Sequence, residues 1–377
     1  MKIKQYQLKG DQRVTDVVEN AQLVLVFGDK ALIAGKDIAG SFNHSFPKAN
    51  VVYCSTAGEI LNTEVSDNTL AVTAVEFEKT EIKTNLVNIS NFKDSYSAGK
   101  HLVDALQHGN LRHILVLADG QLVNGSELVR GMNENLSPTV TISGGLAGDG
   151  PRFQETLVGL NSNIVSGNIV AIGLYGDHLI VGHGSSGGWD SFGPLRRVTK
   201  SKSNVLYELE GKSALDLYKQ YLGELASGLP GTALLFPLSI KLEEDSEPVV
   251  RTVLSVNEAD HSMTFAGDIP LGSQARLMKA NFDRLIDAAS GAATNTFTPF
   301  KGMQPQLAIL ISCVGRKLVL DQRVDEEVES VRNILGEKTF ITGFYSYGEI
   351  SPLMKSPKCE LHNQTMTITA FSEICLQ

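Results

Sequence analysis

Short runs of consecutive apolar residues recur along the chain and indicate buried strands. Three of them open similar stretches of sequence, QLVLVF at 22–27, HILVLA at 113–118 and QLAILIS at 306–312. Each is followed by a segment compatible with a helix. Unbroken Val, Ile and Leu runs that alternate with helices are typical of strands covered on both faces. The pattern therefore predicts an α/β protein.

The three stretches continue in the same way, which indicates an internal repeat. A second strand runs into a turn of small residues and an acid at VVYCSTAGEI (51–60), VTISGGLAGDG (140–150) and FITGFYSYGEI (340–350). A third strand follows at LAVTAVEF (70–77), IVAIGLYG (169–176) and MTITAFS (366–372). We expect repeated β-α-β-β units that form mixed, mostly parallel sheets.

The sequence between the second and third repeats has a different pattern. The segments VVRTVLSV (249–256) and SMTFAGDI (262–269) alternate apolar and polar residues, and the polar NEADH between them is typical of a hairpin turn. The charged LEEDSE (242–247) is expected to be a solvated loop. This part of the chain is predicted to be an intervening, hairpin-rich region.

Helices are predicted from spacing and capping signals. Apolar residues recur every three or four positions in 213–222 and in 273–289. Asn124, three residues before Glu127, has the spacing of a capping box. Both 213–222 and 273–289 are therefore expected to be helical throughout.

The length of 377 residues fits two domains. The polar KSKSN at 200–204 interrupts the apolar pattern. We place the domain boundary there, which gives residues 1–205 and residues 206–377.

Charge and cysteine content exclude several classes of protein. The chain has 33 Lys and Arg against 42 Asp and Glu, a net charge of −9, which disfavours binding to phosphate backbones. It has no apolar run of about 18 residues, so membrane insertion is not expected. The four cysteines lie far apart and form no CxxC pair. We expect a protein of the reducing cytoplasm that binds no nucleic acid.

Two enzyme motifs overlap in one glycine-rich stretch, GHGSSGGW at 182–189. Gly182-x-Gly184-x-x-Gly187 matches the dinucleotide fingerprint, and Gly184-x-Ser186-x-Gly188 matches a nucleophile elbow. Both motifs require a helix directly after the glycines, but the chain continues with GWDSFGPLRR. We therefore expect no enzyme. A hydrolase or transferase that uses Ser186, or an acid from the repeated turns, is the alternative.

The acids of the three repeated turns have two open interpretations. Glu59, Asp149 and Glu349 either cap the N–H groups of their turns or converge as polar groups of a pocket. The glycine-dense turn GGLAGDG (144–150) is either a tight turn or an anion cradle, and the turn is favoured.

His183 differs from the other histidines because it lies among glycines, six residues before the single tryptophan, Trp189. A histidine in such a surrounding can contact a ligand or an iron atom. The alternative is a histidine that is hydrogen-bonded to the backbone.

Two longer segments resemble the FIST family, which has an N-terminal and a C-terminal part. They are GHGSSGGWDSFGPLRRVTKSKSNVLYELEGKSALDLYKQYLG (182–223) and GFYSYGEISP (343–352), and VVYCSTAGEI (51–60) is similar to the N-terminal signature. The resemblance covers the chain from about residue 20 to residue 355, and FYSYGEISP is its most specific part.

The resemblance implies a sensory protein that binds a small ligand and signals to a separate partner, a histidine kinase or a cyclic-diguanylate enzyme. A stand-alone subgroup similar to this chain implies haem and nitric oxide as the ligands. The alternative is a small polar metabolite such as an amino acid. Whether the protein forms a homo-oligomer is left open.

The segments 182–189 and 344–349 both combine glycines with aromatic residues and can present backbone donors beside flat apolar faces, so we expect the ligand cavity where they approach each other. His183 would be the metal ligand. The remaining candidate ligand-binding residues are Trp189, Phe192, Arg196, Arg197, Tyr345, Tyr347 and Glu349.

Overall fold

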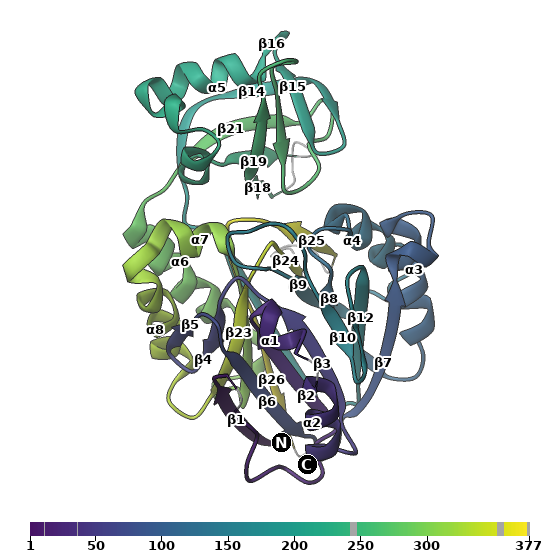
Figure 1. The fold of residues 1–377 in the computed structure, drawn as a ribbon. Helices are drawn as coiled ribbons and strands as arrows, with labels where there is room; N and C mark the ends of the chain where they lie inside the picture. Colours follow the sequence, from purple (N-terminus) through teal and green to yellow (C-terminus); the bar gives the residue numbers. More distant parts are fainter. Residues whose placement is uncertain (11, 36, 242–246, 353–357, 375–377) are drawn as a thin grey trace.

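A computed structural model describes residues 1–10, 12–35, 37–241, 247–352 and 358–374. The chain forms three units of related topology and one inserted lobe, which lies at the top of Figure 1. Most of the charged segment 242–247 falls outside the described residues.

The first and second units follow each other without interruption. The first contains β1 (Lys2–Leu8), β2 (Leu23–Gly28), α1 (Lys30–Ile33), α2 (Ile38–Ser45), β3 (Asn50–Ser55), β4 (Glu59–Leu61), β5 (Glu64–Ser66) and β6 (Leu70–Glu76). The second contains β7 (Glu81–Asn88), η1 (Ile89–Asn91), α3 (Ser95–Leu106), β8 (Leu111–Ala118), α4 (Gly125–Glu134), β9 (Thr141–Leu146), β10 (Val158–Leu160), β11 (Asn163–Val165) and β12 (Asn168–Tyr175).

The third unit is interrupted by the lobe after its first strand. It contains β13 (Leu179–Ser186), α6 (Phe282–Asn295), η4 (Thr298–Phe300), β22 (Leu307–Cys313), α7 (Val314–Leu320), η5 (Asp321–Arg323), α8 (Val324–Leu335), β23 (Phe340–Ser346), β24 (Gly348–Pro352), β25 (Cys359–His362) and β26 (Met366–Glu373). The three units thus repeat one order of strands, which confirms the predicted repeat.

The lobe between β13 and α6 is built on antiparallel strands. It contains β14 (Asp190–Lys202), β15 (Val205–Leu209), β16 (Lys212–Ser213), α5 (Ala214–Leu222), η2 (Gly223–Gly228), η3 (Gly231–Leu235), β17 (Leu238–Lys241), β18 (Val249–Arg251), β19 (Val253–Asn257), β20 (Ser262–Phe265) and β21 (Gln274–Lys279). The predicted boundary after residue 205 falls inside this lobe, at the start of β15, and so does not separate the lobe from the core.

Each unit forms a mixed sheet, in which one pair of strands is parallel. These pairs are β2 with β3, β8 with β9 and β22 with β23. The last strand of each unit returns after a hairpin and runs antiparallel to its neighbour, as short connections require. The sheets are mixed, as predicted, but antiparallel pairs outnumber parallel ones.

The units exchange hairpins in a cyclic order. The hairpin β4–β5 of the first unit pairs with β23 of the third, β24–β25 of the third pairs with β9 of the second, and β10–β11 of the second pairs with β3 of the first. Because every unit completes the sheet of another, none of the three can leave the core without unpairing a strand.

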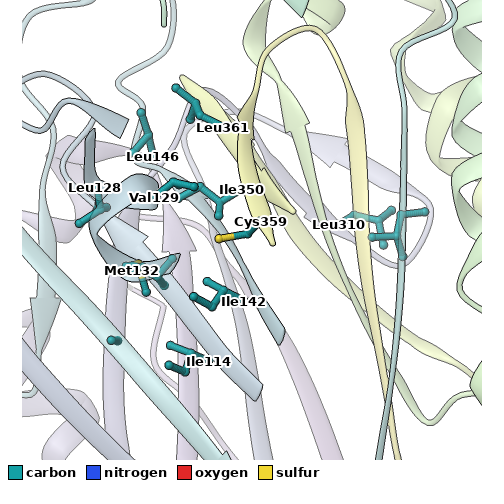
Figure 2. Packing of buried hydrophobic residues seen from close by; sticks show 14 of the residues in the cluster. Ile114, Leu128, Val129, Met132, Ile142, Leu146, Leu310, Ile350, Cys359 and Leu361 are labelled. Atoms are coloured by element: carbon teal, nitrogen blue, oxygen red, sulfur yellow. The ribbon is translucent and has the colours of Figure 1, made fainter. Parts of the chain in front are cut away.

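The three sheets face one another around a shared apolar core. Its side chains come from all three units, and the rings of Phe27 and Phe344 lie 4.8 Å apart at their centroids. Helices cover the outer faces. Figure 2 shows Val129 and Met132 of α4 on the side of the helix that faces Ile350 and Ile142.

One sequence prediction in the lobe region is wrong in its first half. Residues 274–279 form β21, which pairs with β14 and β17, and the helix α6 begins at Phe282. The pairing with two neighbouring strands overrides the helical spacing of this short segment. The helix predicted over 213–222 and the hairpin at 257–262 are both found.

Candidate functional site

The carboxyl ends of the parallel strands lie close together, because the turns that follow them hydrogen-bond to one another. Gly148 N donates to Ser55 O (2.8 Å), Ala57 N donates to Tyr345 O (2.8 Å) and Tyr347 N donates to Leu146 O (3.2 Å). Ligands of α/β proteins commonly bind at the carboxyl ends of strands. The structure places three such ends at one edge of the core, below the lobe.

The three acids of these turns are buried and accept hydrogen bonds from nearby residues. Glu59 accepts from Thr56 Oγ1 (2.5 Å) and Thr69 Oγ1 (2.8 Å), and Glu349 accepts from Ser346 Oγ (2.8 Å) and Thr365 Oγ1 (3.0 Å) in the same arrangement. Asp149 accepts from the N–H groups of residues 154 and 155. The acids therefore fix the turns in place.

Burial changes the protonation of two of these acids. Desolvation raises the pKa of Glu59 to about 7 and that of Glu349 to about 8, against the lowering effect of their hydrogen bonds. Both carboxyls are therefore largely protonated at mildly acidic pH.

A cavity of about 620 Å³ lies between the core and the lobe. The core contributes the loop 120–125 after β8, Tyr347 and the start of α7, and the lobe contributes 252–254 and 265–268. Its volume is in the range of cavities that hold metabolite-sized molecules.

The lining combines apolar side chains with a few polar groups. Leu122, Phe153 and Leu254 are apolar residues of the lining that remain 60%, 38% and 43% exposed. Polar groups come from Asn204 and Asp268 of the lobe. Exposed large apolar side chains gathered at a cavity are typical of binding sites.

The lobe is attached to the core on two sides of this cavity. On one side, Arg251 Nη1 donates to Leu361 O (2.8 Å), and its Nη2 lies 3.6 Å from Glu360. On the other, Trp189 and Met278 pack with Leu320 of α7 and with other apolar side chains. Trp189 thus lies in the connection between the two bodies.

His183 lies in β13, outside the lining of the cavities described here. Its Nε2 is 2.9 Å from Thr141 Oγ1, its ring is 5.2 Å from that of His113, and its Nδ1 is buried without a hydrogen-bond partner among the described residues. Burial lowers its pKa to about 4. His183 is thus held by Thr141 and the ring of His113 and lies outside the three cavities.

Close packing accounts for the glycines around His183. A Cβ atom on Gly182 would lie 2.1 Å from Thr296 O, and one on Gly184 would lie 1.8 Å from Ala292 O. The helix α6 therefore packs directly on the backbone of β13. These glycines serve helix–strand packing, and no helix begins after them as a dinucleotide site requires.

Tyr345 and Trp189 are held by internal hydrogen bonds. Tyr345 is buried, and its hydroxyl donates to Glu327 (2.9 Å), which is also paired with the buried Arg316. Trp189 Nε1 donates to Gln364 O (2.8 Å). Neither residue lines the 620 Å³ cavity.

The predicted residues of the lobe lie away from this cavity. Phe192 and Arg196 line a hollow of about 10 Å³ in the lobe, which has room for about one water molecule. Arg196 binds Glu210 and the hydroxyl of Tyr221, both at 2.6 Å. Arg197 is exposed on β14.

Tyr347 is the one predicted site residue that lines the large cavity. Its ring stacks on Phe153 with centroids 4.4 Å apart, and its hydroxyl donates to Asp149 and lies 2.9 Å from Gly150 O. Burial raises its pKa, so the phenol stays neutral. Of the two segments predicted to line one cavity, 344–349 contributes Tyr347 and 182–189 contributes no residue to the lining.

A second cavity of about 470 Å³ lies on the other side of α7. Lys317 and Arg152 line it together with Glu59 and Asp67, and Lys317 is paired with Asp67. Val314 lines both cavities, so the start of α7 forms part of the wall between them.

Sequence reasoning missed most of the lining. The loop 120–125 follows the buried strand HILVLA directly, and the position of loops after parallel strands could have indicated it. The lobe residues Asn204, Thr252 and Asp268 carry no comparable signal, because only the folded lobe brings them to the core.

The described residues hold no group of three or more His, Cys, Asp or Glu placed for a metal ion. Ser186 lies in β13 opposite Met366, and no hydrogen bond found in the described part of the chain joins its hydroxyl to a histidine or a carboxylate. Among the described helices, none is both long and apolar enough to cross a membrane.

A cavity between a three-unit core and an inserted lobe defines a ligand-binding protein of α/β class. The chain belongs to the FIST family: the FIST N domain matches residues 22–212 and the FIST C domain matches residues 214–352. These domains indicate a small-ligand sensory module. No curated protein matches the chain by sequence.

Two solved structures are similar over nearly the whole chain. A chorismatase is 9% identical, covers 98% of both chains and has a TM-score of 0.36. A cyanuric acid hydrolase from A. caulinodans is 7% identical, covers 99% of both chains and has a TM-score of 0.35. At these low identities and TM-scores, neither similarity supports a conclusion about activity.

Proposed function

We propose that the protein senses a small ligand bound in the 620 Å³ cavity, and that the position of the lobe reports whether the cavity is occupied. The observation that carries this proposal is that both bodies line the cavity. A ligand that touches both binds better when the lobe is close to the core, and such a difference in affinity shifts a conformational equilibrium.

The apolar side chains at the cavity support the same function. Leu122 and Phe153 belong to the core and Leu254 belongs to the lobe, and all three are largely exposed for apolar residues. A ligand between them removes apolar surface from water on both sides at once, at about 25 cal/mol per Å². The ligand therefore stabilises the closed arrangement.

The output of this sensor would be a contact with a separate signalling enzyme. A histidine kinase or a cyclic-diguanylate enzyme is the proposed partner, on the strength of the family relationship. If the partner binds the protein only when the lobe is in one position, a ligand that changes the position of the lobe also changes the binding of the partner.

Haem stays a proposal that rests on the family resemblance. Its predicted ligand, His183, is enclosed between sheets and bonded to Thr141. The described residues that line the large cavity include no histidine. A polar metabolite therefore suits the cavity better than haem.

The test is a ligand screen of the purified protein by thermal shift, with amino acids, amines, organic acids and hemin as probes. A ligand at about one hundred times its Kd adds about 2.7 kcal/mol of stability, which raises Tm by several degrees. A true ligand should also change the emission of Trp189. If stabilising ligands leave Trp189 unchanged and are unaffected by Leu254→Asp, the proposal is wrong. A Soret band with hemin that is lost in His183→Ala would restore the haem assignment.

A further inference from the structure

The charged groups at the large cavity are of one sign. Asp268 is the carboxylate of the lining, and the described lining residues include no lysine, arginine or histidine. Arg251, a buried cation of the lobe, is paired with Glu360 at 3.6 Å and also interacts electrostatically with Asp268. Asp268 itself forms no ion pair within 4 Å among the described residues.

The fold holds Asp268 by its backbone and leaves its carboxylate accessible. Its N–H donates to Ser126 Oγ, and its carbonyl accepts from Arg251 Nε, both at 3.3 Å. The carboxylate accepts one long hydrogen bond, from Asn124 Nδ2 at 3.4 Å. Among the described residues no second donor reaches it.

A second polar group of the same lining lacks a partner. Thr252 is 6% exposed, and its buried hydroxyl makes no hydrogen bond with any described residue. Thr252 O accepts from Ala266 N at 2.9 Å, which places Thr252 beside the segment that carries Asp268. Buried hydroxyls are normally satisfied, so this one indicates a missing hydrogen-bonding group.

The opposite wall offers a flat aromatic surface. Phe153 and Tyr347 stack with an interplanar angle of 16°. Aromatic faces attract cations and pack well against flat apolar groups. The two walls together suit a molecule with a cationic end and an apolar body.

We propose that the sensed ligand is an organic cation, a protonated amine on an apolar or aromatic body. The ammonium group contacts Asp268, the Thr252 hydroxyl rotates out of its buried position to accept a hydrogen bond from it, and the body lies against Phe153. This inference rests on the proposed function, since it concerns the same cavity. A free amino acid fits less well, because no basic side chain of the lining meets its carboxylate.

The test compares three probes that share a phenyl ring and differ in charge: phenethylamine, phenylalanine and 3-phenylpropionate. Their affinities are measured by calorimetry and by Trp189 emission. We expect phenethylamine to bind tightest and Asp268→Asn to weaken it by about tenfold or more, as the loss of a charged hydrogen bond does. The control, Glu208→Gln, removes a lobe carboxylate that pairs with Lys200, outside the lining, and should leave binding unchanged.

Thr252→Val gives a second measure, should Asp268→Asn fail to fold. It removes an unpartnered hydroxyl, so it should fold normally and still weaken the amine. In the wild type, the amine affinity should also fall with rising salt.

Equal or tighter binding of 3-phenylpropionate would overturn the cation assignment, as would an affinity unchanged in a folded Asp268→Asn. If none of the three probes binds while the wider screen yields a neutral or anionic ligand for this cavity, the cation assignment fails and the proposed function stands. If neither yields a ligand, both fail.

Discussion

Arg251 is expected to hold the lobe on the core, and replacing it should release that contact. Its side chain is 2% exposed, and its guanidinium binds Leu361 O at 2.8 Å and lies 3.6 Å from Glu360. Arg251→Met removes both interactions and leaves a largely buried carboxylate without its cation. Breaking one half of a buried pair costs about 3–5 kcal/mol. Because Glu360 keeps 24% exposure, we expect about 2–4 kcal/mol.

Arg251→Met should weaken the contact between the lobe and the core without destabilising either body by itself. Trp189 lies in the connection between them, so its emission should shift to longer wavelength as water reaches it. Hydrogen exchange should increase in 248–254 and 359–362, whereas β2 and β8 in the core should keep their protection.

Two further variants separate this effect from a general loss of charge. Arg196→Met removes an arginine whose partners, Glu210 and Tyr221, both lie within the lobe. It should cost less than about 1 kcal/mol and leave Trp189 unchanged. Arg251→Met combined with Glu360→Gln should recover part of the lost stability, because no uncompensated charge remains. Equal effects of Arg251→Met and Arg196→Met on Trp189 would refute the reasoning.

Three other predictions concern buried groups of the third unit. Burial raises the folded-state pKa of Glu349 to about 8, so between the ordinary carboxyl range and pH 8 the unfolded chain binds fewer protons than the folded one. The free energy of unfolding should therefore fall as pH rises through that window. Glu349→Gln should reduce this fall by several kcal/mol, at about 1.4 kcal/mol per pKa unit, as measured by urea titrations at pH 5 and pH 8. An equally steep fall in the variant would contradict this. Tyr347→Phe removes the hydroxyl that donates a hydrogen bond to the buried Asp149. It should lower the free energy of unfolding by about 1–3 kcal/mol and speed hydrogen exchange in 149–154. Unchanged exchange would argue against this prediction. Cys313 is buried and burial raises its pKa, so it should react with a thiol reagent only after unfolding, and rapid labelling of the native protein would show the opposite.

The repeated units could be predicted from the sequence because each carries its own apolar strands and its own turn. The exchange of hairpins could not, since the partner of β4 is β23, almost three hundred residues away along the chain. Local patterns contain no information about such pairing. The segment 274–279 was assigned to a helix for the same reason: its two partner strands decide its conformation.

The site was harder to predict than the fold. The most specific family motif predicts Tyr347, and the surrounding glycines predict His183. Those glycines are required because α6 packs directly against the backbone of β13. Thr252 and Asp268 become candidates only when the folded lobe meets the core, because no local pattern shows that a hydroxyl lacks a hydrogen-bond partner or that a carboxylate lines the cavity.

The central claim is that the ligand binds between the lobe and the core, and a crystal structure of the protein with a ligand from the screen tests it most directly. We predict ligand density in contact with the loop 120–125 and Phe153 on one side and with 252–254 and 265–268 on the other. Density beside His183, in the hollow near Arg196 or in the cavity lined by Lys317 would contradict the claim.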